Sequence, residues 1–204
     1  DLPIGVFDSG VGGLTVLKAL QQKLPQESFL YLGDTARLPY GTKSPETITR
    51  YVLQASSILV ERGIKFLVIA CNTAASTVSA PLFQSHFPDL NLIGVLEPGA
   101  KAACHMSQTG TIAVIATEAT VKSASYQNAI LRIRPDAYVI SKSCSLFVAL
   151  AEEGLVEGPI AHKIAQKYLH ELLQLEVQKP IDCLVLGCTH FPTLIKTIKK
   201  VIGK

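Results

Sequence analysis

Short runs of β-branched and other apolar residues alternate along the chain with longer stretches in which apolar positions recur every three or four residues. This alternation is typical of strands that are each followed by an amphipathic helix, and it predicts βαβ units around mainly parallel sheets. The predicted strands are residues 4–7, 29–32, 66–70, 92–95, 111–116, 137–141 and 183–187. The predicted helices are residues 14–23, 45–62, 73–85, 99–106, 121–133, 145–153, 159–173 and 192–202.

The clearest helix signal follows Ser44, which is a favourable N-cap, with Pro45 at the first helical position and Gly63 as the stop. A second break comes at Pro98 and Gly99, after which a new series of strands and helices begins. We therefore expect two similar α/β domains, residues 1–96 and 97–204, with mainly parallel central sheets flanked by helices.

The two halves repeat one local pattern. The segments FLVIACNT (66–73) and CLVLGCTH (183–190) each place a cysteine directly after a strand and just before a helix. Ligands of open α/β sheets bind beyond the carboxyl ends of the strands, where helix N-termini present free N–H groups. Cys71 and Cys188 are therefore candidate reactive thiols, and the helix dipole is expected to lower their pKa toward neutrality. Cys104 and Cys183 lack this setting and are interpreted as small buried hydrophobes.

Composition narrows the functional classes. The 204 residues are 48% hydrophobic and 17% charged, which suits a folded chain with a large core, and no apolar run approaches the roughly 18 residues of a membrane span. The net charge of +3 is too small to indicate a nucleic-acid partner. With no export signal ahead of the first strand, the cytoplasm is the expected location, and the five cysteines are expected to be thiols.

Two acidic positions near the first turns allow more than one interpretation. Asp8 ends the first strand in DSGVGG, and it is either the N-cap of the helix near Leu14 or a carboxylate that binds an ammonium group or assists acid–base chemistry. The glycine spacing, with Asp34 after the second strand, also resembles a dinucleotide loop. Thr15 stands where that loop needs its third small residue, and a nicotinamide site would leave the paired cysteines unexplained.

His190 lies two residues after Cys188, at the start of the last helix, where it is either a proton relay for the thiol or a histidine bound to backbone. A metal site built from Cys183, Cys188 and His190 is disfavoured, since the two cysteines would point to opposite faces of the strand and the spacing matches no zinc motif. Glu152 and Glu153 end a preceding helix, and nothing local distinguishes them.

Four motifs in series carry a resemblance. VFDSGVGGLT (6–15), GDTARLPYG (33–41), CNTA (71–74) and LGCTHFP (186–192) together resemble the cofactor-independent glutamate racemases, with weaker matches at residues 94–103 and 117–123. The resemblance implies an isomerase that interconverts L-glutamate and D-glutamate without a cofactor or metal, and that supplies D-glutamate for peptidoglycan and hence for cell-wall biogenesis and cell shape. It implies a small-molecule substrate rather than a nucleic acid or a membrane, and it leaves a homodimer open.

The resemblance also implies roles for individual residues. Cys71 and Cys188 would be the two acid–base residues, facing each other across a cleft between the domains, with Asp8 as the acidic partner of Cys71 and His190 as that of Cys188. Glu152, not Glu153, matches the family's glutamate near that histidine. The implied substrate-binding residues are Asp8, Ser9, Tyr40, Gly41, Asn72, Thr73, Thr117, Thr120, Thr189 and His190.

The chain departs from the family pattern at a few packing positions and at its end, because family chains return with a further strand and helix that complete the first domain. Three other functions stay open on the residues alone, two enzymatic and one of binding only. A related racemase would act on aspartate or a similar acid, a thiol hydrolase would use Cys188 as nucleophile with His190 as base, and a silent protein would bind ligand without turnover.

Overall fold

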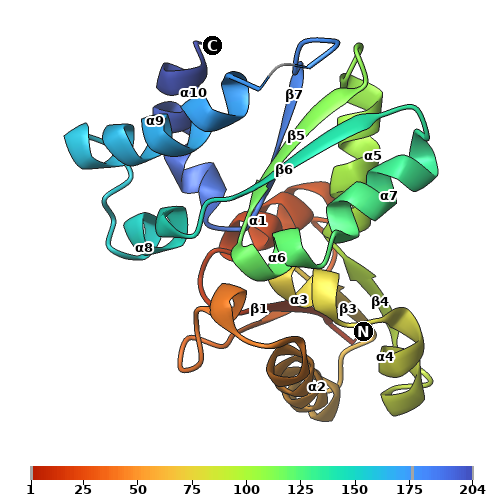
Figure 1. The fold of residues 1–204 in the computed structure, drawn as a ribbon. Coiled ribbons are helices and arrows are strands. Elements are labelled where there is room, and N and C mark those ends of the chain that lie inside the picture. Colours follow the sequence, from red (N-terminus) through yellow and green to blue (C-terminus); the bar gives the residue numbers. More distant parts are fainter. Residues whose placement is uncertain (1, 176, 204) are drawn as a thin grey trace. The chain divides into compact units, whose positions relative to one another are not determined.

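The computed structural model describes residues 2–175 and 177–203 of the chain. By its internal contacts the chain divides into two compact units, Asp1–Val95 and Leu96–Lys204. Each unit has a parallel sheet with helices packed on it (Figure 1). The prediction of an α/β fold with mainly parallel sheets is therefore confirmed.

The first unit carries a parallel sheet in the order β2-β1-β3-β4 within the described residues. Its elements are β1 (Ile4–Asp8), α1 (Leu14–Lys23), β2 (Phe29–Gly33), η1 (Tyr40–Thr42), α2 (Pro45–Glu61), β3 (Phe66–Ile69), α3 (Asn72–Thr77), α4 (Ala80–His86) and β4 (Asn91–Gly94). Alternation along the strands divides their side chains between two faces. Val6 and Val68 pack toward α1 on one face, and α2 packs on the other (Figure 1).

The second unit has the strand order β6-β5-β7. Its elements are α5 (Leu96–Met106), β5 (Thr111–Ala116), α6 (Glu118–Lys122), α7 (Ser125–Ile133), β6 (Tyr138–Ser143), α8 (Leu146–Glu152), α9 (Pro159–Leu173), β7 (Cys183–Gly187), η2 (Phe191–Leu194) and α10 (Ile195–Ile202). Ala113 and Ile115 of β5 belong to the core that α8, α9 and α10 cover. In Figure 1 the pair α5 and α7 lies on the other side of this sheet.

The two sheets share a topology. β1 is flanked by β2 and β3, and β5 is flanked by β6 and β7, so in each unit the first strand of the sheet lies between the next two. The equivalent strands are thus β1 and β5, β2 and β6, and β3 and β7. Cys71 follows β3 and Cys188 follows β7, so the repeated cysteine pattern occupies equivalent places in the two sheets.

Three predicted helices differ from the observed ones, two because of local backbone breaks and one because it begins earlier than predicted. The predicted helix 73–85 is two helices, since Val78 and Ser79 are extended and Ser79 caps α4. The predicted helix 121–133 is also two, separated at Ala124, whose φ is 52°. Pro98 and Gly99 do not separate a strand from a helix but lie in the first turns of α5, where proline removes no helical hydrogen bond.

The ends of other elements agree closely with the sequence. Ser44 caps α2 as predicted, with its Oγ accepting from the backbone N–H of Thr47, and Gly63 follows the helix with φ of 77°. The predicted last helix 192–202 starts with a turn of 3-10 helix, η2, before α10. Strand β6 extends to Ser143, two residues beyond the predicted end.

Candidate active site

The carboxyl edge of the first sheet carries the predicted residues of the first unit. Asp8 ends β1, and Cys71 follows β3 as the N-cap residue of α3. Because β1 pairs directly with β3 in parallel, the ends of these two strands lie side by side. The turn η1, with Tyr40 and Gly41, belongs to the connection that leaves β2, the other neighbour of β1. The buried residues Asn72 and Thr73 form the first turn of α3.

Asp8 is fully buried, and its Oδ2 accepts a hydrogen bond of 3.0 Å from the backbone N–H of Gly10. The interpretation of Asp8 as a helix N-cap is wrong, since the N-cap of α1 is Gly13 and no side chain caps that helix. The carboxylate instead holds its own turn. A Cβ atom on Gly13 would lie 2.5 Å from the Asp8 Cβ, so only glycine allows the start of α1 to approach this closely.

The Cys71 thiol is 5% exposed and donates a hydrogen bond of 3.3 Å from Sγ to the Ser9 hydroxyl. Burial, and then the charge of Asp8, raise the pKa of Cys71 to about 11. The hydrogen bonds of Cys71 with Ser9 and with the backbone of Ala74 lower its pKa but are outweighed. The expectation that the helix dipole lowers the pKa of this thiol is therefore wrong for Cys71, because desolvation and a neighbouring carboxylate both disfavour the thiolate.

Tyr40 is almost fully buried, and its hydroxyl donates a hydrogen bond of 2.5 Å to Oδ2 of Asp34. Burial and this hydrogen bond raise the pKa of Tyr40, so the phenol stays protonated. The same Asp34 oxygen pairs with Nε of Arg37 at 2.6 Å. The sequence suggested for Asp34 only the disfavoured interpretation as a ribose-binding acid, and its carboxylate is used within the unit. The sequence offered no signal for its pairing with Tyr40.

A further contact holds the turn after β1. The Tyr31 hydroxyl donates to the carbonyl oxygen of Gly10 at 2.7 Å, and burial followed by the charge of Asp8 raises the pKa of Tyr31. This tyrosine was missed, because an aromatic residue in a strand is most simply interpreted as part of the core.

The second unit repeats the arrangement at the carboxyl edge of its own sheet. Cys188, Thr189 and His190 follow β7, and all three are buried. Thr117 follows β5, the neighbouring strand, and caps α6 by accepting from the backbone N–H of Thr120. The hydroxyl oxygens of Thr117 and Thr120 are 3.0 Å apart. The five residues thus gather at the ends of two adjacent strands.

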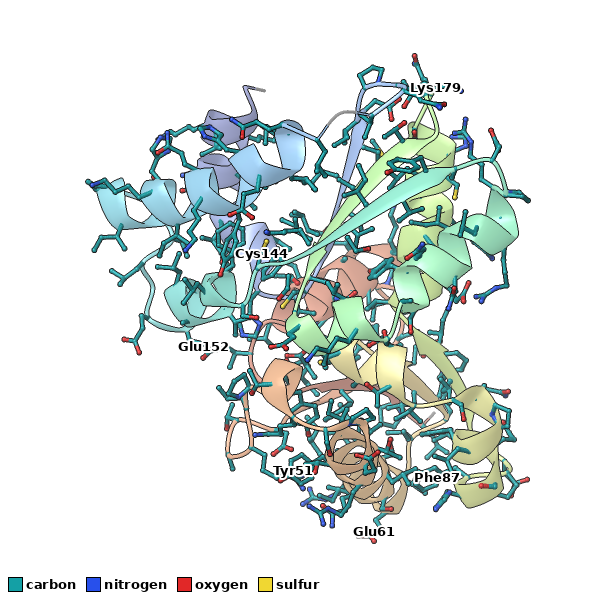
Figure 2. All side chains as sticks on the ribbon, in the orientation of Figure 1. Tyr51, Glu61, Phe87, Cys144, Glu152 and Lys179 are labelled. Carbon is teal, nitrogen blue, oxygen red and sulfur yellow. The ribbon has the colours of Figure 1, made fainter. Side chains whose placement is uncertain are left out.

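A chain of side chains leads away from Cys188. Its Sγ lies 3.6 Å from Nδ1 of His190, and Nε2 of the same ring is hydrogen-bonded to Oε1 of Glu152. Glu152 is the last residue of α8 (Figure 2). Both Glu152 and Glu153 are exposed, and it is the contact with His190 that distinguishes Glu152 from Glu153, which the local sequence could not do.

Tyr126 on α7 is a neighbour of Cys188 that sequence reasoning missed. It is buried, and its pKa is raised first by burial and then by Cys188. A Cβ atom on Gly187 would lie 3.1 Å from its ring, so this glycine allows the tyrosine to pack against the end of β7. Its 62-residue separation from Cys188 hid this contact from any local pattern.

The other three cysteines lie outside these clusters. Cys144 is fully buried, and burial raises its pKa to about 12 (Figure 2). Cys104 and Cys183 are only partly buried, so their interpretation as buried hydrophobes is wrong. Across residues 2–175 and 177–203, no group of three His, Cys, Asp or Glu side chains could hold a metal ion. In the same ranges, no helix is both long enough and apolar enough to cross a membrane.

Comparison with known proteins shows which family carries a similar sequence. Residues 4–204 match the family model described as Asp/Glu/Hydantoin racemase. The glutamate racemase of Geobacter metallireducens is 51% identical over 98% of this chain and 72% of its own length, and that of Aquifex aeolicus is 45% identical over 98% and 76%.

Solved structures give the same result. A glutamate racemase from Francisella tularensis subsp. tularensis, in complex with D-glutamate, superposes with a TM-score of 0.90 at 39% identity, covering 99% of this chain and 74% of that one. The glutamate racemase from Aquifex pyrophilus gives 0.82 at 46% identity, covering 100% and 77%. The chain therefore belongs to the Asp/Glu/hydantoin racemase family.

Proposed function

We propose that this chain interconverts L-glutamate and D-glutamate by removing the α proton from one face of the carbon and delivering a proton to the other. The observation that carries the proposal is the repeated half-site, in which a thiol follows equivalent strands of two sheets, Cys71 in one unit and Cys188 in the other. Inversion at a carbon needs a base on one side and an acid on the other. A chain with two such thiols can supply both.

In the proposed reaction, the Cys188 thiolate takes the α proton of L-glutamate while the Cys71 thiol donates its own to the opposite face. The roles are reversed for D-glutamate. The residues 1–96 and 97–204 act as the two lobes of the enzyme, and each lobe supplies one of the two thiols. Each turnover leaves the two thiols in exchanged protonation states, so the enzyme is then ready for the opposite direction.

The environment of Cys71 suits a proton donor. Its raised pKa keeps the thiol protonated in the absence of ligand. A substrate ammonium group beside Asp8 would offset the charge of that carboxylate, and this would lower the pKa of Cys71 toward the range in which it also acts as a base. Asp8 thus has two tasks, to bind the ammonium group and to adjust the thiol.

The environment of Cys188 suits a base. His190 lies within reach of its sulfur and can accept the thiol proton, while Glu152 fixes the orientation of the ring through its contact with Nε2. The pair then consists of a thiolate and an imidazolium. Such a pair is the usual way in which proteins activate a cysteine.

The developing charge on the substrate must be met by fixed donors, because the α proton of an amino acid is only weakly acidic. The hydroxyls of Ser9, Thr73, Thr117, Thr120 and Thr189, the amide of Asn72 and the backbone of Tyr40 and Gly41 are the proposed binding groups. The proposed step involves no cofactor or metal.

In the proposed role, the D-glutamate product serves peptidoglycan synthesis in the cytoplasm, and a homodimer is compatible with this scheme.

One observation favours a second candidate, a thiol hydrolase. Cys188, His190 and Glu152 form a chain of nucleophile, base and orienting acid, which is the arrangement of thiol hydrolases. That activity has no use for Cys71. A covalent acyl-enzyme on Cys188, detected by mass spectrometry after incubation with an ester substrate, would favour the hydrolase.

The proposed function is tested by following the circular dichroism of L-glutamate, and separately of L-aspartate, with no added cofactor. We expect the glutamate signal to decay to zero, and we expect Cys71→Ser and Cys188→Ser each to stop the decay. Cys104→Ser is the matched control, because Cys104 lies outside both half-sites and its loss should leave the rate unchanged. Full turnover in Cys71→Ser or in Cys188→Ser would contradict the proposal. So would decay of the aspartate signal with no decay of the glutamate signal.

A further inference from the structure

The segment between β2 and α2 reaches the carboxyl edge of the first sheet with little regular structure of its own. Between Asp34 and Ser44 the short turn η1 is its helical part. Backbone hydrogen bonds connect Arg37 to Asp34 and Lys43 to Tyr40, and both lie within the segment. Beyond the backbone bond from Asp34 to Asp8, side chains hold this segment against the rest of the unit.

Asp34 is the centre of that attachment. Its carboxylate is 8% exposed. Its Oδ2 accepts a hydrogen bond from the Tyr40 hydroxyl and forms an ion pair with Nε of Arg37. Its own backbone N–H donates to the carbonyl oxygen of Asp8 at 3.0 Å, which fixes Asp34 to the end of β1. A buried carboxylate is costly unless charged or polar groups satisfy it, and two such groups converge on this one oxygen.

Arg37 connects the same carboxylate to α2. Its Nη1 donates to Oε1 of Gln54 at 2.6 Å, and its guanidinium carbon lies 4.3 Å from the ring centre of Tyr51. Figure 2 shows Tyr51 on α2. The Tyr40 ring lies 5.6 Å from that of Tyr51 and 6.3 Å from that of Phe7. The turn is thus held from two sides, by α2 and by β1.

The proton of the Tyr40 hydroxyl is committed to Asp34. A phenol has one proton to donate, so this hydroxyl cannot at the same time donate to a carboxylate of a ligand. If Tyr40 and Gly41 bind substrate, the backbone of the turn must do so rather than the phenol proton. The phenol then serves to set the position of that backbone.

We propose that Asp34 and Arg37 are positioning residues for the substrate-binding turn Tyr40–Thr42, and that Asp34 acts through the hydroxyl of Tyr40. This inference rests on the proposed function, in which Tyr40 and Gly41 bind glutamate. Neither Asp34 nor Arg37 is assigned contact with the substrate. A turn that binds substrate equally in the ground and transition states changes KM and leaves kcat unchanged when it is displaced.

The test compares KM and kcat for glutamate racemisation in the full chain and in Asp34→Asn, Tyr40→Phe and the double variant. We expect each single substitution to raise KM about tenfold with kcat within about twofold, as for loss of a hydrogen bond to a charged group. Because the two residues act through one bond, the double variant should stay within about threefold of either single one. Glu27→Gln is the control, since it removes a carboxylate from a partly exposed ion pair with Lys65 in the same unit.

Arg37→Lys provides a second route should Asp34→Asn fail to fold, as judged by its thermal unfolding. Lysine keeps the charge but loses the planar fork and the stacking on Tyr51, so KM should again rise with kcat unchanged. An unchanged KM in the folded variants, a fall of kcat alone, or a roughly hundredfold KM effect in the double variant would overturn the proposal.

An inactive wild-type chain would overturn the proposed function instead. The positioning role would then be decided by the Kd for glutamate from calorimetry. A Kd about tenfold higher in each single variant, with the Kd of the double variant within about threefold of either single one, would support the role, and an equal Kd throughout would overturn it.

Discussion

At Cys71 two general effects act against each other. The start of a helix favours a thiolate, while burial and a nearby carboxylate favour the thiol, and the raised pKa shows that the second pair prevails. The sequence predicted the first effect because it depends only on position after a strand. Burial and the approach of Asp8 depend on the packed unit, and no local pattern gives them.

At Cys188 the decisive partners are also distant in the chain. The sequence places His190 two residues away, but Glu152 comes from α8, 38 positions earlier. Family resemblance selected Glu152 over Glu153, and side-chain geometry agrees with that choice. Tyr126, which lies on α7, could not have been selected by either means.

A prediction at the residue scale concerns Glu152. Replacing Glu152 by Gln keeps the size of the side chain but removes the carboxylate that is hydrogen-bonded to Nε2 of His190. We expect kcat/KM to fall about tenfold or more, as for loss of a charge-assisted hydrogen bond. The fall must be equal in both directions, because the two enantiomers have equal free energies.

The measurement is initial-rate circular dichroism from L-glutamate and from D-glutamate. Glu153→Gln is the control, since Glu153 is exposed at the adjacent position, and its rates should stay within about twofold of the wild type. A Glu152→Gln variant as active as the wild type would rule out the proton relay through His190 and Glu152.

At the element scale, strands were predicted better than helix breaks. All seven predicted strands are present with ends shifted by at most two residues, because short β-branched runs between turns leave little choice. The breaks at Val78–Ser79 and at Ala124 were missed. The first was signalled only by a serine before an Ala-Pro pair, and the left-handed backbone of Ala124 has no sequence signal, since alanine is not a residue that favours it.

Close approach of the turns after β1 and β2 gives a second prediction. A Cβ atom on Gly33 would lie 2.3 Å from the carbonyl oxygen of Gly10, and that carbonyl is held by the Tyr31 hydroxyl. We expect Gly33→Ala to destabilise the protein by about 2–3 kcal/mol, since backbone would have to move. The urea midpoint measures the change.

Gly154→Ala is the comparison, because Gly154 has φ of 70° but no atom within 4 Å of its added Cβ. This substitution should lower the free energy of unfolding by about 1 kcal/mol, from backbone conformation alone. If Gly33→Ala were no more destabilising than Gly154→Ala, the close packing of the two turns would be disproved.

At the scale of the whole molecule, the shared strand order of the two sheets gives the repeated cysteine pattern a structural basis. The sequence showed the echo between residues 66–73 and 183–190. It did not show that β1 and β5 are both flanked by the next two strands of their sheets, because pairing partners are a property of the assembled sheet. The division into residues 1–96 and 97–204 as functional lobes stays a proposal.

Global stability should depend on pH through Cys71. Its folded-state pKa of about 11 exceeds the ordinary thiol value of 9.0. Below pH 9 the thiol is protonated in both states and contributes no pH dependence. As pH rises from 9 to 11, the unfolded chain loses its thiol proton first, so unfolding becomes easier and stability falls by roughly 2 kcal/mol.

Urea unfolding of the wild type and of Cys71→Ser at pH 8 and pH 10.5 isolates this effect, since all other groups are common to both proteins. We expect the wild type to lose more stability over this interval than the variant. Equal losses would mean that the Cys71 thiol is not held in its neutral form by the fold.

The central claim is that two different groups handle the proton on the two faces of the α carbon. Racemisation of L-glutamate in D₂O, followed by NMR of the α position in both enantiomers, tests it most directly. We predict that D-glutamate carries deuterium from the first turnovers while the remaining L-glutamate keeps its protium. Transfer of the original protium into D-glutamate, or deuterium entering unreacted L-glutamate as fast as the product forms, would contradict the two-thiol mechanism.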